Sequence, residues 1–142
     1  MPYAFAQKIV EKYANKYHII QIGRHEGHAL QGVEFVNKPM TNHELFACLV
    51  FSDKRVLIDS CLQHAAAAMN LKSTVLWIGT SHKNFGYDTH DNILAKPPKG
   101  NVKLIDSYLF DYSFDGIVHE CPYMDFQEMF DINEIYRSID RQ

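Results

Sequence analysis

The chain has 142 residues, of which 46% are hydrophobic and 22% are charged, and its formal net charge is −3 at pH 7. This length is typical of one domain, so we expect a single domain over residues 1–142 with a core of its own. No stretch approaches the roughly 20 apolar residues that span a bilayer, and the charged N-terminus differs from a secretory signal. We therefore expect a cytoplasmic protein without membrane insertion.

The cysteine, histidine and basic residues argue against three further kinds of protein. Cys48, Cys61 and Cys121 are odd in number and have no CxxC spacing, which indicates neither a disulfide framework nor a zinc ribbon. His25 and His28 are not part of an HExxH motif, and we expect no metal site and no resident cofactor. The 14 Lys and Arg residues are scattered along the chain, so nucleic acid is not an expected partner.

The spacing of apolar residues predicts helices that alternate with strands up to residue 78. Phe5, Ile9 and Tyr13 recur every four residues, which is typical of a helix. Thr41 and Glu44 form a capping box, the signature of a helix N-terminus. Short β-branched runs that end at glycine or polar residues predict strands. The predicted order is helix 3–16, strand 18–22, strand 33–36, a helix from about residue 42, strand 55–58, helix 60–70 and strand 74–78.

The pattern is weaker in the rest of the chain. Strand fragments are predicted at 92–94 and 102–105, and short helices at 125–130 and 132–139, the second with Asp131 as its N-cap. Because strands and helices alternate at βαβ spacing, we expect an α/β fold: a Rossmann-like, three-layer domain with a mainly parallel sheet. The ligand crevice of such a domain lies at the carboxyl ends of the strands.

The turn from Ile58 to His64 carries the most chemistry. A strand delivers Asp59 and Ser60 to the start of a helix, and His64 follows one turn later. Unpaired N–H groups and the positive end of the helix dipole make such a turn a natural binding site for a diphosphate. Two alternatives remain: Asp59 or Ser60 is a plain N-cap, or Cys61 and His64 form a nucleophilic pair.

Two other loops leave strands at the same expected edge of the sheet. The loop at 79–87 includes Gly79, Thr80 and Ser81 and could close over a sugar or a phosphate, although such loops are often structural. The loop after the first strand contains Glu26, a carboxylate able to accept two hydroxyl hydrogen bonds, as in ribose recognition.

Three motifs, taken in chain order, resemble the C-terminal half of the ADP-heptose:lipopolysaccharide heptosyltransferase family over about residues 2–95. They are Ile22-Gly23 with Glu26, the run Asp59-Ser60-x-x-x-His64-x-Ala66-Ala67-Ala68, and Val75-Leu76-x-x-Gly79-Thr80 with Phe85-Gly86-Tyr87. In that family this half is the Rossmann-like domain of a GT-B glycosyltransferase and binds the nucleotide-sugar donor.

The resemblance also implies roles for individual residues. Ser60, Cys61 and His64 would hold the donor diphosphate, Asp59 the sugar hydroxyls and Glu26 the ribose. Gly79, Thr80 and Ser81 would form a loop over the donor. The partner implied is a nucleotide-diphosphate sugar, and the process is lipopolysaccharide biosynthesis.

The chain departs from the family pattern in three respects. Cys61 stands where the family usually has glycine. The family's acceptor domain, with its catalytic base, is not matched, and neither is the first strand of the donor-binding half, which carries a donor-binding lysine. We therefore expect a donor-binding domain that is not catalytic alone; the alternative is a non-catalytic interaction module that retains the fold.

The unmatched strand has a structural consequence. In the strand order 3-2-1-4-5 it lies at the centre of the sheet. We expect strand 18–22 to pair directly with strand 55–58; alternatively, a partner chain or a second copy supplies the strand.

Overall fold

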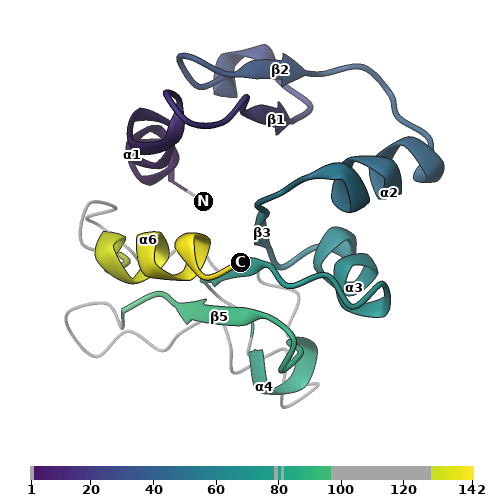
Figure 1. The fold of residues 1–142 in the computed structure, drawn as a ribbon, viewed down its shortest axis with the longest axis vertical. Helices are drawn as coiled ribbons and strands as arrows, with labels where there is room; N and C mark the ends of the chain where they lie inside the picture. Colours follow the sequence, from purple (N-terminus) through teal and green to yellow (C-terminus); the bar gives the residue numbers. More distant parts are fainter. Residues whose placement is uncertain (1, 79, 81, 97–128) are drawn as a thin grey trace, which may run out of the picture. The chain divides into compact units, whose positions relative to one another are not determined.

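The computed structural model describes residues 2–78, 80, 82–96 and 129–142 (Figure 1). The chain divides into two compact units, Met1–Glu44 and Leu45–Gln142, each of which is described by itself. The single domain over 1–142 remains a prediction, since one domain can contain two such units. The α/β class is confirmed in both units.

The first unit contains a helix and a two-stranded parallel sheet. Its elements are α1 (Tyr3–Tyr13), β1 (Ile20–Ile22), the short 3-10 helix η1 (Glu26–His28) and β2 (Glu34–Val36). Strand β1 pairs with β2 so that Gln21 lies opposite Phe35. The predicted helical stripe is confirmed, because Phe5, Ile9 and Tyr13 are all buried along α1.

The second unit is built on three parallel strands. Its elements in chain order are α2 (Asn42–Phe51, which begins at the end of the first unit), β3 (Val56–Ile58), α3 (Cys61–Ala68), β4 (Thr74–Trp77), α4 (His82–Phe85), β5 (Asp91–Leu94) and α6 (Ile132–Asp140). The strand order is β3-β4-β5, with Leu57 opposite Val75 and Val75 opposite Asn92. Every residue of the central strand β4 is buried, as expected for a parallel strand covered on both faces.

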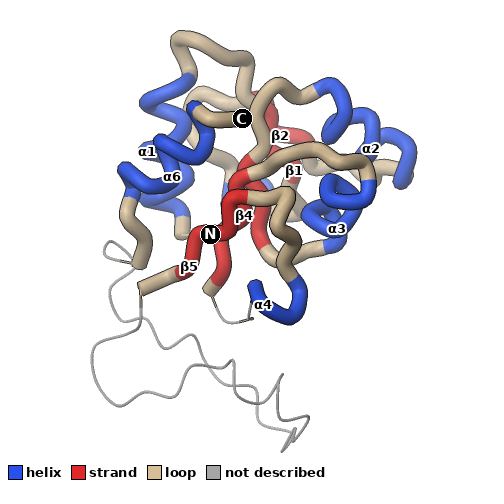
Figure 2. The backbone as a smooth tube through the Cα atoms, turned by 60° about the horizontal axis from the view of Figure 1, so that its bottom comes forward, coloured by secondary structure: helices blue, strands red, loops and turns tan. Residues whose placement is uncertain are grey.

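Helices cover both faces of this sheet. Figure 2 shows α6 on one side of β4 and β5 and α3 on the other. Ile135 and Ile139 of α6 are almost fully buried, as is Ala66 of α3. The second unit therefore has the three-layer arrangement that the alternation of elements predicts.

Two predicted helix starts are confirmed. At α2, the backbone N–H of Thr41 donates to Glu44 Oε2 at 2.7 Å, and the N–H of Glu44 donates to Thr41 Oγ1 at 3.3 Å. At α6, Asp131 Oδ1 accepts from the N–H of Asn133 at 2.9 Å. The hydrogen bonds from Thr41 also hold the pKa of the Glu44 carboxyl below its ordinary value.

The expected pairing of strand 18–22 with strand 55–58 is wrong. Strand β1 pairs with β2 in one sheet, and β3 pairs with β4 in another. Among the described residues one edge of β3 is therefore open, and Ile58 on this strand is 43% exposed.

Three predictions from the second half of the sequence differ in outcome. The fragment at 92–94 is the strand β5, whereas the fragment at 102–105 lies outside the described residues. So does most of the predicted helix 125–130, and its last residues, 129 and 130, are a bend. The sequence did not predict α4, which occupies part of the expected loop 79–87.

Polar side chains fasten α6 to the sheet. Ser138 Oγ lies 2.6 Å from Thr74 Oγ1 and donates to Asp91 Oδ2 at 2.9 Å. Lys72 and Arg141 also pair with the Asp91 carboxylate, at 3.3 and 3.4 Å. Partial burial raises the pKa of Asp91, but the hydroxyl and the two cations more than offset this, so its pKa is below the ordinary value.

Removal of the N-cap should destabilise α6. We expect Asp131→Ala to lower the free energy of unfolding by about 1 kcal/mol, because a first-turn N–H loses its acceptor. Urea unfolding followed by circular dichroism measures the change. Asp131→Asn is the control, since asparagine caps about as well, and an equal loss in both variants would contradict this role for the side chain.

The lowered pKa of Asp91 predicts a loss of stability in acid. The ionised carboxylate stabilises the fold above the unfolded-state pKa of about 4, and this contribution disappears as the pH falls through the folded-state pKa. Asp91→Asn should therefore be less stable than the wild type at pH 7, with a difference that shrinks below about pH 4. Urea titrations at several pH values test this, with the exposed Asp88→Asn as control; a difference independent of pH would refute it.

Candidate functional site

The turn between β3 and α3 leaves the start of the helix open. Ser60 is the N-cap residue, with extended backbone angles of φ −163° and ψ 170°, but its side chain makes no capping hydrogen bond. Asp59 does not cap the helix either, because its Oδ2 accepts from Thr80 Oγ1 at 2.5 Å. The alternative of a plain N-cap is therefore confirmed for the position of Ser60, whereas a capping hydrogen bond from its side chain is absent.

The open helix start supplies hydrogen-bond donors. The first N–H groups of a helix have no acceptor within the helix, and the helix dipole adds partial positive charge there. The N–H of Gln63 already donates to the Ser60 carbonyl at 3.2 Å. Among the described residues, the donors that a ligand could use are thus the N–H groups of Ser60, Cys61 and Leu62.

Asp59 and Thr80 come from neighbouring strands. Asp59 follows β3 and Thr80 follows β4, and parallel pairing brings the carboxyl ends of the two strands to one edge. The hydrogen bond between them uses one oxygen of the exposed Asp59 carboxylate. The same edge is where ligands bind in open parallel sheets.

His64 has a partner that the sequence reasoning did not assign. Its Nδ1 lies 3.0 Å from the hydroxyl of Tyr87, and the two rings meet edge to face with centroids 5.6 Å apart. Tyr87 was included in the predicted loop but not as a contact of the histidine. The Cys61/His64 nucleophilic pair stays a prediction: Nδ1 of the ring lies next to Tyr87, and Cys61 is an exposed free thiol.

A buried amide joins α3 to the loop after β4. Gln63 is fully buried, and its Nε2 donates to the Phe85 carbonyl at 3.0 Å. His90 is 5% exposed, and its Nε2 donates to the Gln63 carbonyl at 2.9 Å. Sequence reasoning missed both residues. The available signal was spacing, since Gln63 precedes the buried Ala66 by three residues and so shares its helix face.

Gly86 brings Tyr87 close to the preceding helical turn. Its N–H donates to the His82 carbonyl at 2.8 Å, and a Cβ at this position would lie 2.5 Å from the same oxygen. No other residue fits there unless the backbone moves. The glycine therefore sets the path by which the chain leaves α4 and reaches Tyr87.

The remaining predicted site residues are not placed at this turn. Gly79 and Ser81 lie outside the described residues. Glu26 belongs to the first unit, where it is exposed and its Oε1 accepts from Asn37 Nδ2 at 2.8 Å. Its second carboxylate oxygen is the one that could accept a ribose hydroxyl.

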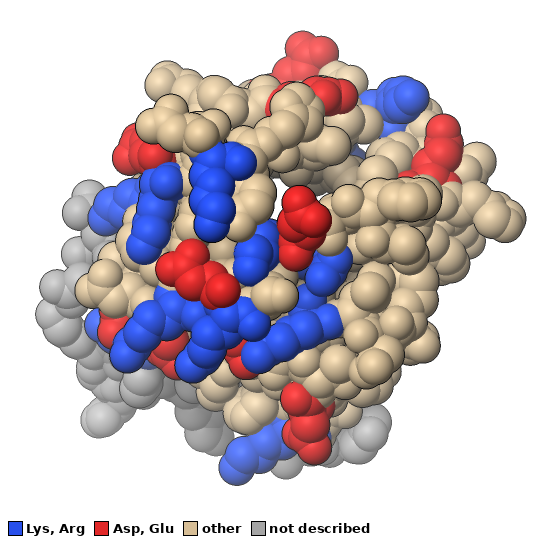
Figure 3. Space-filling model, viewed as in Figure 1, with Lys and Arg blue, Asp and Glu red and all other residues tan. Residues whose placement is uncertain are grey.

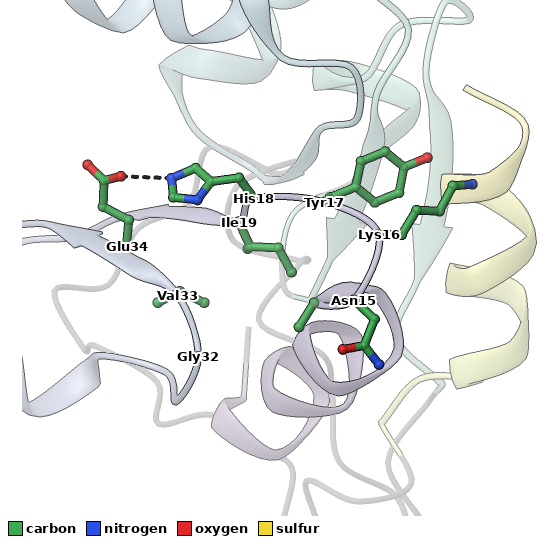
Figure 4. Close-up of a pocket in the computed structure, with 9 residues that line it drawn as sticks. Asn15, Lys16, Tyr17, His18, Ile19, Gly32, Val33 and Glu34 are labelled. Atoms are coloured by element: carbon green, nitrogen blue, oxygen red, sulfur yellow. Dashed lines mark hydrogen bonds and ion pairs between the residues drawn. The ribbon is translucent and has the colours of Figure 1, made fainter.

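A cavity in the first unit is a second candidate site. It has a volume of about 580 Å³ and lies between the end of α1 and the beginnings of β1 and β2 (Figure 4). His18 Nε2 and Glu34 Oε2 on its rim are 2.8 Å apart, but these side chains are 70% and 57% exposed. Exposed pairs contribute about 0–1 kcal/mol, and the amino ends of parallel strands are not the usual ligand edge.

Other classes of site lack a structural basis in the described residues. Figure 3 shows acidic side chains among the basic ones on the face viewed. No three His, Cys, Asp or Glu side chains of the described residues are grouped as metal ligands. None of the helices that the structure describes has the length and apolar character needed to cross a membrane.

Comparison with known proteins does not identify a family. Neither the protein-family models nor the curated proteins nor the solved structures contain a match to this chain.

The close approach at Gly86 is open to a direct test. We expect Gly86→Ala to lower the free energy of unfolding by about 1–3 kcal/mol, because the added methyl group meets a backbone carbonyl. Gly27→Ala is the matched control, since a Cβ there has no atom within 4 Å. Equal stability of the two variants in urea unfolding would show that the turn adapts without cost.

Proposed function

We propose that the second unit binds the diphosphate of a nucleotide-diphosphate sugar at the start of α3. The observation that carries this proposal is the open helix start: neither the side chain of Ser60 nor that of Asp59 caps α3, and His64 lies one turn further on. A helix start that its own side chains do not cap retains the donors that bind phosphate oxygens. The resemblance to heptosyltransferases supports the same assignment.

Each residue of the turn has a chemical role in this proposal. The backbone of Ser60 and Cys61 and the imidazole of His64 bind the diphosphate. Asp59 accepts hydrogen bonds from sugar hydroxyls through the carboxylate oxygen that Thr80 does not occupy. Thr80, whose hydroxyl donates to Asp59, follows β4 beside this turn. The roles of Glu26 at the ribose and of Gly79 and Ser81 in a loop over the donor stay predictions from the sequence.

The proposed activity is glycosyltransferase-like donor binding, with no transfer by this chain alone. Transfer requires an acceptor held against the donor and a general base, whereas this turn offers only stabilisation of the leaving diphosphate. A partner chain or a second copy would supply the acceptor site. We place this chemistry in the cytoplasm and in the assembly of lipopolysaccharide.

One observation favours a second candidate function, a non-catalytic interaction module. The side chain of Cys61 is exposed at the position where the resembled family has glycine. A Cβ at that position limits how closely a phosphate can approach the backbone. In this alternative the fold is retained and the donor site is lost.

Calorimetric titration with ADP, UDP, GDP and their sugars tests the proposal. We expect a micromolar Kd for at least one nucleotide, and a loss of affinity of tenfold or more in His64→Ala, about 1.4 kcal/mol. His43→Ala, at an exposed histidine of α2, is the control and should bind as the wild type does.

The same titration also tests the alternative, the non-catalytic interaction module. Millimolar or absent binding of every nucleotide by the folded wild-type chain favours the interaction module. The variant Cys61→Gly distinguishes donor binding from the interaction module further. It should increase the affinity for nucleotide if the turn is a phosphate site, and should leave the affinity unchanged if the site is lost.

A further inference from the structure

Tyr87 contacts His64 next to the α3 turn, but its side chain has no role in the function proposed above. Its ring is 42% exposed, yet its hydroxyl lies 3.0 Å from Nδ1 of His64. Removal of this hydroxyl would leave most of the packing of an exposed ring unchanged. The contact is therefore better explained by its effect on His64 than by burial.

The backbone of Tyr87 is held firmly. Its carbonyl accepts from Asn92 Nδ2 at 3.0 Å and from the N–H of His90 at 3.1 Å. Asn92 is itself fixed, since its Oδ1 accepts from Trp77 Nε1 at 2.9 Å. Together with the close approach at Gly86, these bonds fix the position from which the phenol reaches His64.

Gln63 restrains the same imidazole without occupying a ring nitrogen. Its Nε2 lies 3.2 Å from Nδ1 and 3.1 Å from Nε2 of His64. An amide nitrogen placed along the lone pair of one ring nitrogen would be much farther from the other. The amide therefore contacts the ring between its two nitrogens, and its hydrogen bond to the Phe85 carbonyl fixes its orientation.

We infer that Tyr87 is a positioning residue that donates its hydroxyl proton to Nδ1 of His64 and holds the ring in the Nε2–H tautomer. A neutral imidazole has one donor and one acceptor nitrogen, and the hydrogen bond made by one nitrogen determines the role of the other. With Nδ1 as acceptor, Nε2–H remains as a donor for a phosphate oxygen. The role of Nε2–H as a donor to phosphate rests on the proposed function, whereas the assignment of the tautomer is independent of it.

Long-range ¹H–¹⁵N NMR of the ¹⁵N-labelled full chain at about pH 8, where free imidazole is neutral, tests the inference. The His64 signals are assigned by their loss in His64→Ala. We expect an unprotonated Nδ1 and a protonated Nε2 in the wild type without ligand. Tyr87→Phe should shift His64 toward a mixture of tautomers, whereas Tyr3→Phe, at an exposed tyrosine of α1, should not.

A protonated Nδ1 in the wild type, or an unchanged tautomer in Tyr87→Phe, overturns the inference. The titration with ADP supplies a second readout, because Tyr87→Phe should weaken binding about tenfold while the variant stays folded. Unchanged affinity in Tyr87→Phe, with binding lost in His64→Ala, also overturns it. Absence of binding of ADP, UDP, GDP and all their sugars by the wild type instead refutes the proposed function, and the NMR result then tests the tautomer alone.

Discussion

The parallel pairing of β3, β4 and β5 is the constraint on which the candidate site depends. Parallel strands end at the same edge, so the residues that follow them meet although they are far apart in the sequence. Asp59 and Thr80 are 21 positions apart and form a hydrogen bond for this reason. An antiparallel arrangement of the same strands would send the two residues to opposite ends of the sheet, and α3 would begin away from the loop that contains Tyr87.

Patterns within a few residues predicted most helices and strands, whereas the candidate site depends on contacts between residues far apart in the sequence. The capping residues Thr41 and Asp131 act within one helical turn, so their roles were readable from the sequence. Tyr87 lies 23 residues from His64 and Phe85 lies 22 residues from Gln63, and no local pattern specifies these contacts. The pairing of β1 failed as a prediction for the same reason, because the neighbour of a strand is a property of the whole sheet.

At the start of α3, the side chains of Ser60 and Asp59 do not make the capping hydrogen bonds that their positions would allow. Ser60 is the N-cap residue of α3, but its side chain makes no capping hydrogen bond. Asp59 is turned toward Thr80, which leaves the helix start to external groups. Behind the turn, Gln63 is fully buried and its Nε2 donates to the Phe85 carbonyl, and loss of this partner would cost about 1–3 kcal/mol.

The composition of β3 bears on the solubility of the second unit, because one edge of this strand is unpaired among the described residues. Edge strands in natural proteins usually carry a lysine, a proline or a bulge that discourages other chains from joining the sheet. Val56, Leu57 and Ile58 include none of these residues, and Ile58 is 43% exposed. A strand of this composition whose edge stays uncovered is a template for association between chains at high concentration, and a lysine at position 58 would discourage it.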